Sequence, residues 1–200
     1  MKRRSFLKSG LAGMTIPALT GVSGLSLAST LPWAGNRPSL IVSDARFQSC
    51  RQFGAAAAQA GLQHFSFDGD ITSLWFEHLD PKWLKHQSVV AGMTARQPLF
   101  VLERLAWDRG MRVVLRVEHN WLDDGSIAHR IEAPGHQLPP LANLLEGQAD
   151  WSDRLARMSA NCSWRNQGAC SRGTANSPAL HQPGRSASLV SWVIAPARPA

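Results

Sequence analysis

The stretch from Pro38 to Glu118 constrains the fold most, because short apolar runs alternate there with longer amphipathic ones. Strands are predicted at 39–42, 62–67, 88–92 and 112–118. Helices are predicted between them, at about 45–60, 72–79 and 95–109. An alternation of strand and helix is typical of a mostly parallel sheet with helices on both faces.

Capping residues support these boundaries. Asp44 and Thr94 stand where helix N-caps are expected, and Asp80 precedes a proline suited to the first helical position. Gly61 and Gly110 stand where helices end, since glycine adopts the left-handed backbone of a C-terminal cap.

The chain beyond residue 118 is less regular. A turn at 123–125 precedes an expected antiparallel strand at 127–132, and residues 134–140 are expected to form a loop. A helix is predicted at 149–160, a mobile polar loop at about 161–188 and a last strand at 189–194.

The sequence therefore predicts one α/β domain over residues 38–196, followed by a tail at 197–200. The expected architecture is a three-layer sandwich with a mostly parallel sheet of four to five strands. It resembles Rossmann-like or flavodoxin-like folds, but without the G-x-G-x-x-G turn after the first strand.

The N-terminus carries a distinct motif. Arg3 and Arg4 precede Ser5, and Phe6, Leu7 and Lys8 follow. This run resembles the twin-arginine translocation (Tat) signal at every matching position. The resemblance covers the first tenth of the chain and implies export of a folded protein to the bacterial periplasm through the Tat translocon.

The segment after the arginines suits a cleaved signal peptide. Residues 9–30 are moderately apolar and interrupted by glycines and a proline, unlike a membrane span. Small residues at Ser26 and Ala28 predict a signal peptide of residues 1–28, and Ala34 marks an alternative cleavage site. A linker is expected at 29–37, with no stable membrane anchor after cleavage.

Net charge gives no support for a nucleic-acid partner. The formal charge is +7, but four of the 21 basic residues lie within the first eight positions. The remainder holds 17 basic against 14 acidic residues, with no basic cluster along the sequence.

Polar residues at the predicted strand ends are the candidate site. Ligands of parallel sheets gather beyond the carboxyl ends of the strands. Asp44, Asp68, Asp70 and His119 are candidate catalytic or metal-binding residues, since carboxylates and imidazoles serve as acids, bases and ligands. The candidate ligand-binding residues beside them are Arg46, Thr94 and Asn120, with Glu118 at the same strand end. The structural alternative is that these residues form caps and turns.

Cofactor motifs are missing. The sequence has no dinucleotide-binding glycine turn, P-loop, nucleophile elbow, haem-attachment motif or cysteine cluster for iron–sulfur. Its seven histidines are scattered without metal-site spacing. The cofactor is therefore left unknown.

The three cysteines divide by position. Cys162 and Cys170 lie close enough in sequence to form a disulfide in an oxidising periplasm, or to remain unpaired. Cys50 falls on the apolar stripe of the first helix, which predicts a buried and inert thiol.

Two hypotheses about function follow. The first is an accessory or interaction protein of an exported redox system, with a redox-enzyme subunit as partner. The second is a small periplasmic enzyme, or a ligand- or metal-binding protein, with its site at the carboxyl ends of the strands.

Overall fold

The computed structural model describes residues 36–165, 169–179 and 188–197. The chain divides into two units, Met1–Leu31 and Pro32–Ala200, and every described residue belongs to the second. The twin-arginine motif and both candidate cleavage sites lie outside the described residues, so the signal peptide stays a prediction. The same holds for all but two residues of the linker and all but the first residue of the tail.

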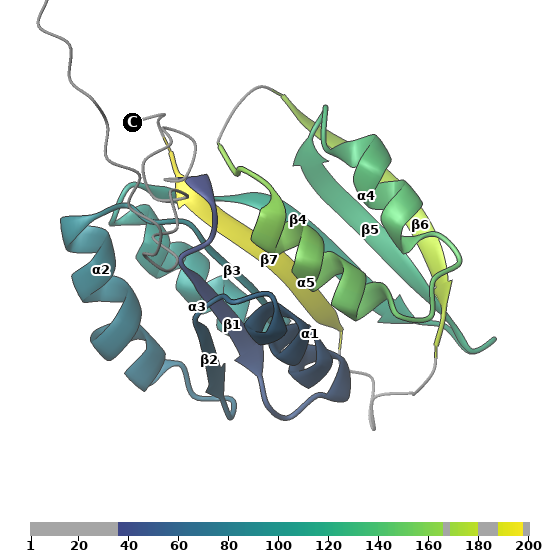
Figure 1. Ribbon diagram of the computed structural model, residues 1–200, viewed down its shortest axis with the longest axis horizontal. Coiled ribbons are helices and arrows are strands. Elements are labelled where there is room, and N and C mark those ends of the chain that lie inside the picture. Colours follow the sequence, from purple (N-terminus) through teal and green to yellow (C-terminus); the bar gives the residue numbers. More distant parts are fainter. Residues whose placement is uncertain (1–35, 166–168, 180–187, 198–200) are drawn as a thin grey trace, which may run out of the picture. The chain divides into compact units, whose positions relative to one another are not determined.

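One seven-stranded sheet organises the described chain, with the strand order β2-β1-β3-β7-β4-β5-β6 (Figure 1). The strands are β1 (Leu40–Asp44), β2 (His64–Phe67), β3 (Val90–Ala95), β4 (Met111–Trp121), β5 (Ser126–Pro134), β6 (Cys170–Pro178) and β7 (Leu189–Pro196). The helices are α1 (Gln48–Gln59), the π-helix η3 (Leu74–Leu79), α2 (Asp80–Lys85), α3 (Arg96–Trp107), α4 (Leu138–Leu145) and α5 (Trp151–Asn161).

The α/β class is confirmed, but the predicted mostly parallel sheet of four to five strands is wrong. Only β1–β2 and β1–β3 pair in parallel, and the other four pairs are antiparallel. The last strand, β7, runs antiparallel between β3 and β4, so β4 still points in the direction of β3. The carboxyl ends of β1 to β4 therefore share one edge, as the sequence predicts.

A glycine helps to place β7 beside β3. Trp192 pairs directly with Gly92, and a Cβ atom at Gly92 would lie 2.5 Å from the Trp192 ring. The buried indole therefore lies across the β3 backbone in space that any side chain would fill. The Trp192 Nε1–H donates to Thr94 Oγ1 (3.2 Å), which gives this buried donor a partner.

Two segments predicted as loops are regular structure. Cys170–Pro178, within the loop predicted at 161–188, forms β6 because its backbone pairs with β5 along its full length. Of its residues only Ala175 and Ser177 are buried, so its composition is as polar as that of a loop. Helix α4 begins inside the loop predicted at 134–140, and its prolines stand in the first turn, where a missing N–H leaves no hydrogen bond unmade.

The two faces of the sheet are covered unequally. One face packs against α1, α4 and α5, which together reach from β1 to β6 (Figure 1). The opposite face packs against η3, α2 and α3, whose buried residues contact β1, β2, β3 and β7. Within the described residues, no helix covers β4, β5 and β6 on that second face beyond the border that α3 forms along β4. None of the described helices has the length and apolarity needed to cross a membrane.

Candidate functional site

The predicted site at the end of β1 is an ion pair. Asp44 is fully buried, and both of its carboxylate oxygens accept hydrogen bonds from Arg46, at 2.9 Å from Nε and 2.7 Å from Nη2. This bonding, with the charges of Asp44 and Asp68, raises the pKa of Arg46. A bidentate guanidinium occupies the carboxylate that a metal or substrate would need.

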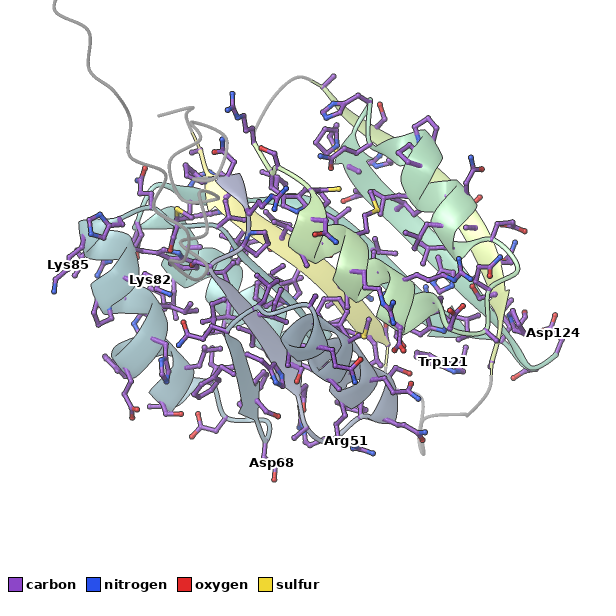
Figure 2. All side chains as sticks on the ribbon, viewed as in Figure 1. Arg51, Asp68, Lys82, Lys85, Trp121 and Asp124 are labelled. Carbon is purple, nitrogen blue, oxygen red and sulfur yellow. The ribbon has the colours of Figure 1, made fainter. Side chains whose placement is uncertain are left out.

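The two other aspartates of this edge are exposed and lie on either side of Gly69. Gly69 has a φ of +77°, and a Cβ there would lie 2.8 Å from the Arg46 Nη1 atom, so the guanidinium lies against this turn. Asp68 stands at the carboxyl end of β2 (Figure 2). Asp70 accepts hydrogen bonds from the Thr72 N–H (2.8 Å) and hydroxyl (2.6 Å), which lower the pKa of Asp70. Asp70 therefore stabilises the turn before η3.

Thr94 also has a structural role, because its hydroxyl is already hydrogen-bonded within the core. Its side chain is fully buried, donates to the carbonyl of Ala95 (2.8 Å) and accepts from Trp192. The structure brings Asp44, Arg46 and Asp68 together, but it uses Thr94 and Asp70 elsewhere.

His119 lies in a buried hydrogen-bonded chain with a second histidine. Its Nδ1 atom is 2.7 Å from Nδ1 of His129, and its Nε2 atom is 2.8 Å from the Ser191 hydroxyl. His129 Nε2 is 2.9 Å from the Ser177 hydroxyl, which donates to the carbonyl of Leu145 (2.5 Å). The carbonyl can only accept, so Ser177 donates to it and accepts from His129, and with both imidazoles neutral the direction of every other bond in the chain follows.

Both imidazoles are neutral in that arrangement. Ser177 accepts from His129 Nε2–H, so His129 Nδ1 accepts from His119 Nδ1–H, and Ser191 donates to His119 Nε2. Burial lowers the pKa of His129 to about 4. Burial, and secondarily repulsion from His129, lowers the pKa of His119 well below its usual value.

Trp151 of α5 seals this pair from solvent. Its ring centroid lies 4.4 Å from that of His119 and 5.1 Å from that of His129, and both histidines are at most 1% exposed. No carboxylate among the described residues contacts either imidazole. The pair is therefore a satisfied polar element of the core, closed to a substrate.

The residues on either side of His119 point the opposite way, onto the uncovered part of the sheet. We call this surface the open face. It consists of alternate residues of three strands: Arg116, Glu118 and Asn120 of β4, Ala128, Arg130 and Glu132 of β5, and Arg172, Thr174 and Asn176 of β6. Of the candidates at the end of β4, Glu118 and Asn120 thus reach this surface, where Asn120 accepts a hydrogen bond from Ser188 (3.1 Å).

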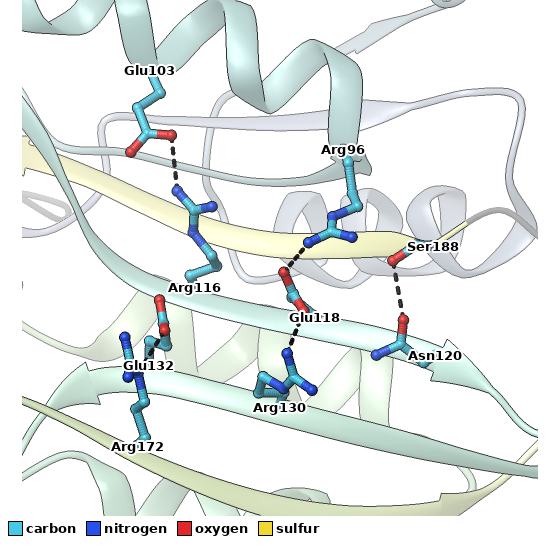
Figure 3. Close-up of polar contacts among 9 residues, drawn as sticks. All are labelled: Arg96, Glu103, Arg116, Glu118, Asn120, Arg130, Glu132, Arg172 and Ser188. Atoms are coloured by element: carbon cyan, nitrogen blue, oxygen red, sulfur yellow. Dashed lines mark hydrogen bonds and ion pairs between the residues drawn. The ribbon is translucent and has the colours of Figure 1, made fainter.

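Strand register arranges these charges in rows (Figure 3). Arg116 pairs with Glu132, which pairs with Arg172. Glu118 pairs with Arg130, which pairs with Thr174. Opposite charges across neighbouring strands stabilise this register modestly.

Helix α3 borders the open face and bonds to it twice. Arg96 bonds to Glu118, and Glu103 accepts from Arg116 Nη2 (2.8 Å). Between α3 and β4 lies a groove of about 220 Å³, lined partly by Leu99, Phe100 and Val190. A second hollow of about 160 Å³ continues past Glu103 toward Cys170.

The open face presents arginine more than glutamate to solvent. The side chains of Arg96, Arg130 and Arg172 are 58%, 68% and 80% exposed. The side chains of Glu118, Glu103 and Glu132 are 13%, 18% and 33% exposed, and the remaining arginine of these pairs, Arg116, is 30% exposed. Each glutamate is thus less exposed than the arginines that pair with it.

The thiols and the metal-binding groups add no further site. Cys50, Cys162 and Cys170 are all free, so the predicted disulfide is not formed in this structure. Burial raises the pKa of Cys50 well above its usual value, in keeping with the expected inert thiol. The described residues contain no group of three or more His, Cys, Asp or Glu side chains placed to hold a metal ion.

Comparison of the chain with protein families, characterised proteins and solved structures finds no match.

Sequence reasoning placed the carboxyl ends of β1 to β4 at one edge of the sheet but missed the open face. Arg116, Arg130 and Arg172 were not among the predicted residues. The signal lay in the alternation of charged and apolar residues at 115–120 and 127–132, which indicates strands with one polar face.

Proposed function

We propose that this protein is an exported accessory protein that binds a partner protein through the open face and its α3 border. The observation that carries the proposal is the unequal covering of the sheet. A three-helix layer closes one face from β1 to β6, whereas the other face leaves β4, β5 and β6 uncovered within the described residues. Surfaces of this kind are used for binding when they hold exposed arginine and aromatic residues.

The border of α3 supplies those aromatic residues. Phe100 is 59% exposed and Trp107 is 41% exposed, and the Arg104 guanidinium lies over both rings, 5.3 Å and 4.1 Å from their centroids. Trp and Arg are the residue types that contribute most to protein–protein affinity.

The N-terminal motif supports export. Arg3, Arg4, Phe6, Leu7 and Lys8 match the Tat pattern, and Tat cargo crosses the membrane folded and in some cases with a partner bound. A periplasmic location and a redox-enzyme subunit as partner are parts of the proposal that rest on this motif alone.

Affinity capture of the tagged full-length chain from the bacterial periplasm tests the function. The test variant combines Arg130→Glu with Arg172→Glu. The control combines Lys85→Glu with Arg157→Glu, which reverses two exposed charges on α2 and α5. We expect a protein captured by the wild type and the control but lost from the open-face variant. Equal capture by all three, or capture of no protein, contradicts the proposal.

A further inference from the structure

The uncovered strands are as wide as one helix. Strands lie about 4.8 Å apart, and packed helices lie about 8–10 Å apart, so a helix beside another one lies about two strands further across a sheet. Helix α3 packs over β3, β7 and β4. A second helix in the same layer would therefore lie over β4 and β5, along the groove that α3 borders.

The charge of this position favours an acidic occupant. Four arginines and three glutamates form the salt bridges of the open face and its border (Figure 3). Arg104 adds a fifth arginine that pairs with no carboxylate among the described residues. Because the glutamates are less exposed than their arginine partners, an approaching helix meets guanidinium groups first.

The border also favours an amphipathic occupant. Arg96, Phe100, Glu103 and Trp107 follow one stripe of α3, at helical spacings of four, three and four. Leu99, Phe100 and Val190 line the groove beside this stripe. An occupant with an apolar side toward α3 and an acidic side toward β5 and β6 would satisfy both surroundings.

We propose that the partner binds by an acidic amphipathic helix laid over β4 and β5, alongside α3. The inference rests on the proposed function and names the chemistry of the partner. Carboxylates of the helix bond to Arg130 and Arg172, and its apolar stripe contacts Phe100 and Trp107. The mode is that of a helix in a groove, with arginine providing bidentate carboxylate contacts.

A nucleic acid suits the same surface less well. Glu118 and Glu132 alternate with the arginines, so the open face has no continuous basic stripe of the kind that a phosphate backbone follows. The described strand residues of the open face include no aromatic side chain on which successive bases could stack, and the exposed Phe100 and Trp107 lie on the α3 border alone.

Fluorescence anisotropy with synthetic probes tests the inference on the full chain. The first probe is a labelled helical peptide of about 16 residues built from Leu, Ala and Glu, with leucines on one stripe. The second replaces every Glu by Lys, and the third has the first composition with the leucines scattered round the helix. The fourth is a single-stranded oligothymidylate of about 16 nucleotides.

We expect the first probe to bind at least about tenfold more tightly than the others. Arg130→Glu with Arg172→Glu should weaken it at least about tenfold, whereas Lys85→Glu with Arg157→Glu should leave its affinity unchanged. A Phe100→Ala variant should weaken it severalfold without changing the response to salt. That pattern supports the inference.

Three results overturn it. They are no binding of the first probe, equal binding of the scattered probe, and binding of the oligonucleotide as tight as that of the first probe. If periplasmic capture still depends on Arg130 and Arg172, the proposed function survives while the acidic helix is rejected. If capture fails as well, both are rejected.

Discussion

The two sides of β4 and β5 differ sharply although their residues alternate along the same strands. His119 and His129 point under α5, where Trp151 seals them and serines satisfy their nitrogens. Glu118 and Arg130, one residue away along each strand, point to the open face, where the Arg130 side chain is 68% exposed. A position at a strand end therefore does not decide whether a residue is functional. The face on which its side chain lies decides whether it is sealed in the core or reaches the surface.

This contrast separates stability from binding. Substitutions on the sealed side should change the free energy of unfolding and leave the open face intact. Substitutions on the open side should change binding and leave the free energy of unfolding almost unchanged. The predictions below test that separation.

The largest effect is expected at Trp151. The Trp151→Ala change should destabilise the protein by about 3–5 kcal/mol, because the change removes a buried ring and exposes the histidine pair. Urea unfolding followed by circular dichroism measures this. Trp107→Ala, at the open-face border, is the matched control and should cost about 1 kcal/mol or less. Similar losses in both variants would show that the two sides are not distinct.

The second largest effect is expected from acid, which should lower the free energy of unfolding by protonating His119 and His129. The unfolded chain binds protons at its histidines near pH 6.5, whereas the folded pKa of His129 is about 4 and that of His119 is also lowered. The stability that the two neutral histidines contribute is therefore present in full above pH 6.5, and it is lost as the pH falls toward 4. The loss is on the order of 3 kcal/mol for His129 alone.

Urea unfolding at a series of pH values between 7 and 5 measures the slope of the free energy of unfolding against pH, before most carboxylates titrate. The His119→Leu, His129→Leu variant should lose most of it, and the remainder belongs to groups such as His64, whose pKa burial also lowers. His136→Asn, at an exposed histidine, is the control and should keep the slope. An unchanged slope in the double variant would disprove the role given to the pair.

A smaller loss is expected at Ser177. The Ser177→Ala change leaves the Leu145 carbonyl and His129 Nε2–H without their buried partner and should cost about 2 kcal/mol. The half-exposed Ser171 provides the comparison, since Ser171→Ala should cost less than about 0.5 kcal/mol. Thermal unfolding of the two variants is sufficient. Equal melting temperatures would mean that the chain of hydrogen bonds contributes nothing.

The smallest effect on stability is expected on the open face. Arg130→Ala and Arg172→Ala should each change the free energy of unfolding by less than about 0.5 kcal/mol, because both guanidiniums are largely exposed and their ion pairs are screened by water. Urea unfolding at low and high salt tests this. A loss of about 2 kcal/mol in either variant would show that the charged rows stabilise the fold, and would contradict this prediction.

The sequence predicted the α/β class and the first four strands, because their apolar runs are local features. The N-caps expected at Asp44 and Thr94 were wrong, since α1 begins after Phe47 and α3 after Ala95, and neither helix has a side-chain cap. The Asp44 carboxylate binds Arg46 instead, and the Thr94 hydroxyl bonds to Ala95 and Trp192. It did not predict where the last strand pairs, since 189–194 is apolar except for Ser191 and nothing local indicates its neighbours. The close approach of Trp192 to Gly92 becomes visible only in the folded chain. Strand β6 was missed because an edge strand with one exposed face has the composition of a loop.

The candidate site divides in the same way. Asp44, Arg46 and Asp68 share the predicted edge, and Asn120 reaches the open face. His119 was selected by its place at a strand end, but its burial depends on Trp151, a residue 32 positions away that no local pattern connects to it. The arginines of the open face come together only through the pairing of β4 with β5 and of β5 with β6.

Site-specific photo-crosslinking in the living cell tests the central claim most directly. A photoreactive amino acid replaces Thr174 on the open face or Arg157 on α5 of the full-length chain, and both positions are exposed. We predict a discrete adduct with one protein from position 174 and none from position 157. We also predict that Arg130→Glu with Arg172→Glu removes the adduct. An adduct only from position 157, or none from either position, would contradict the account.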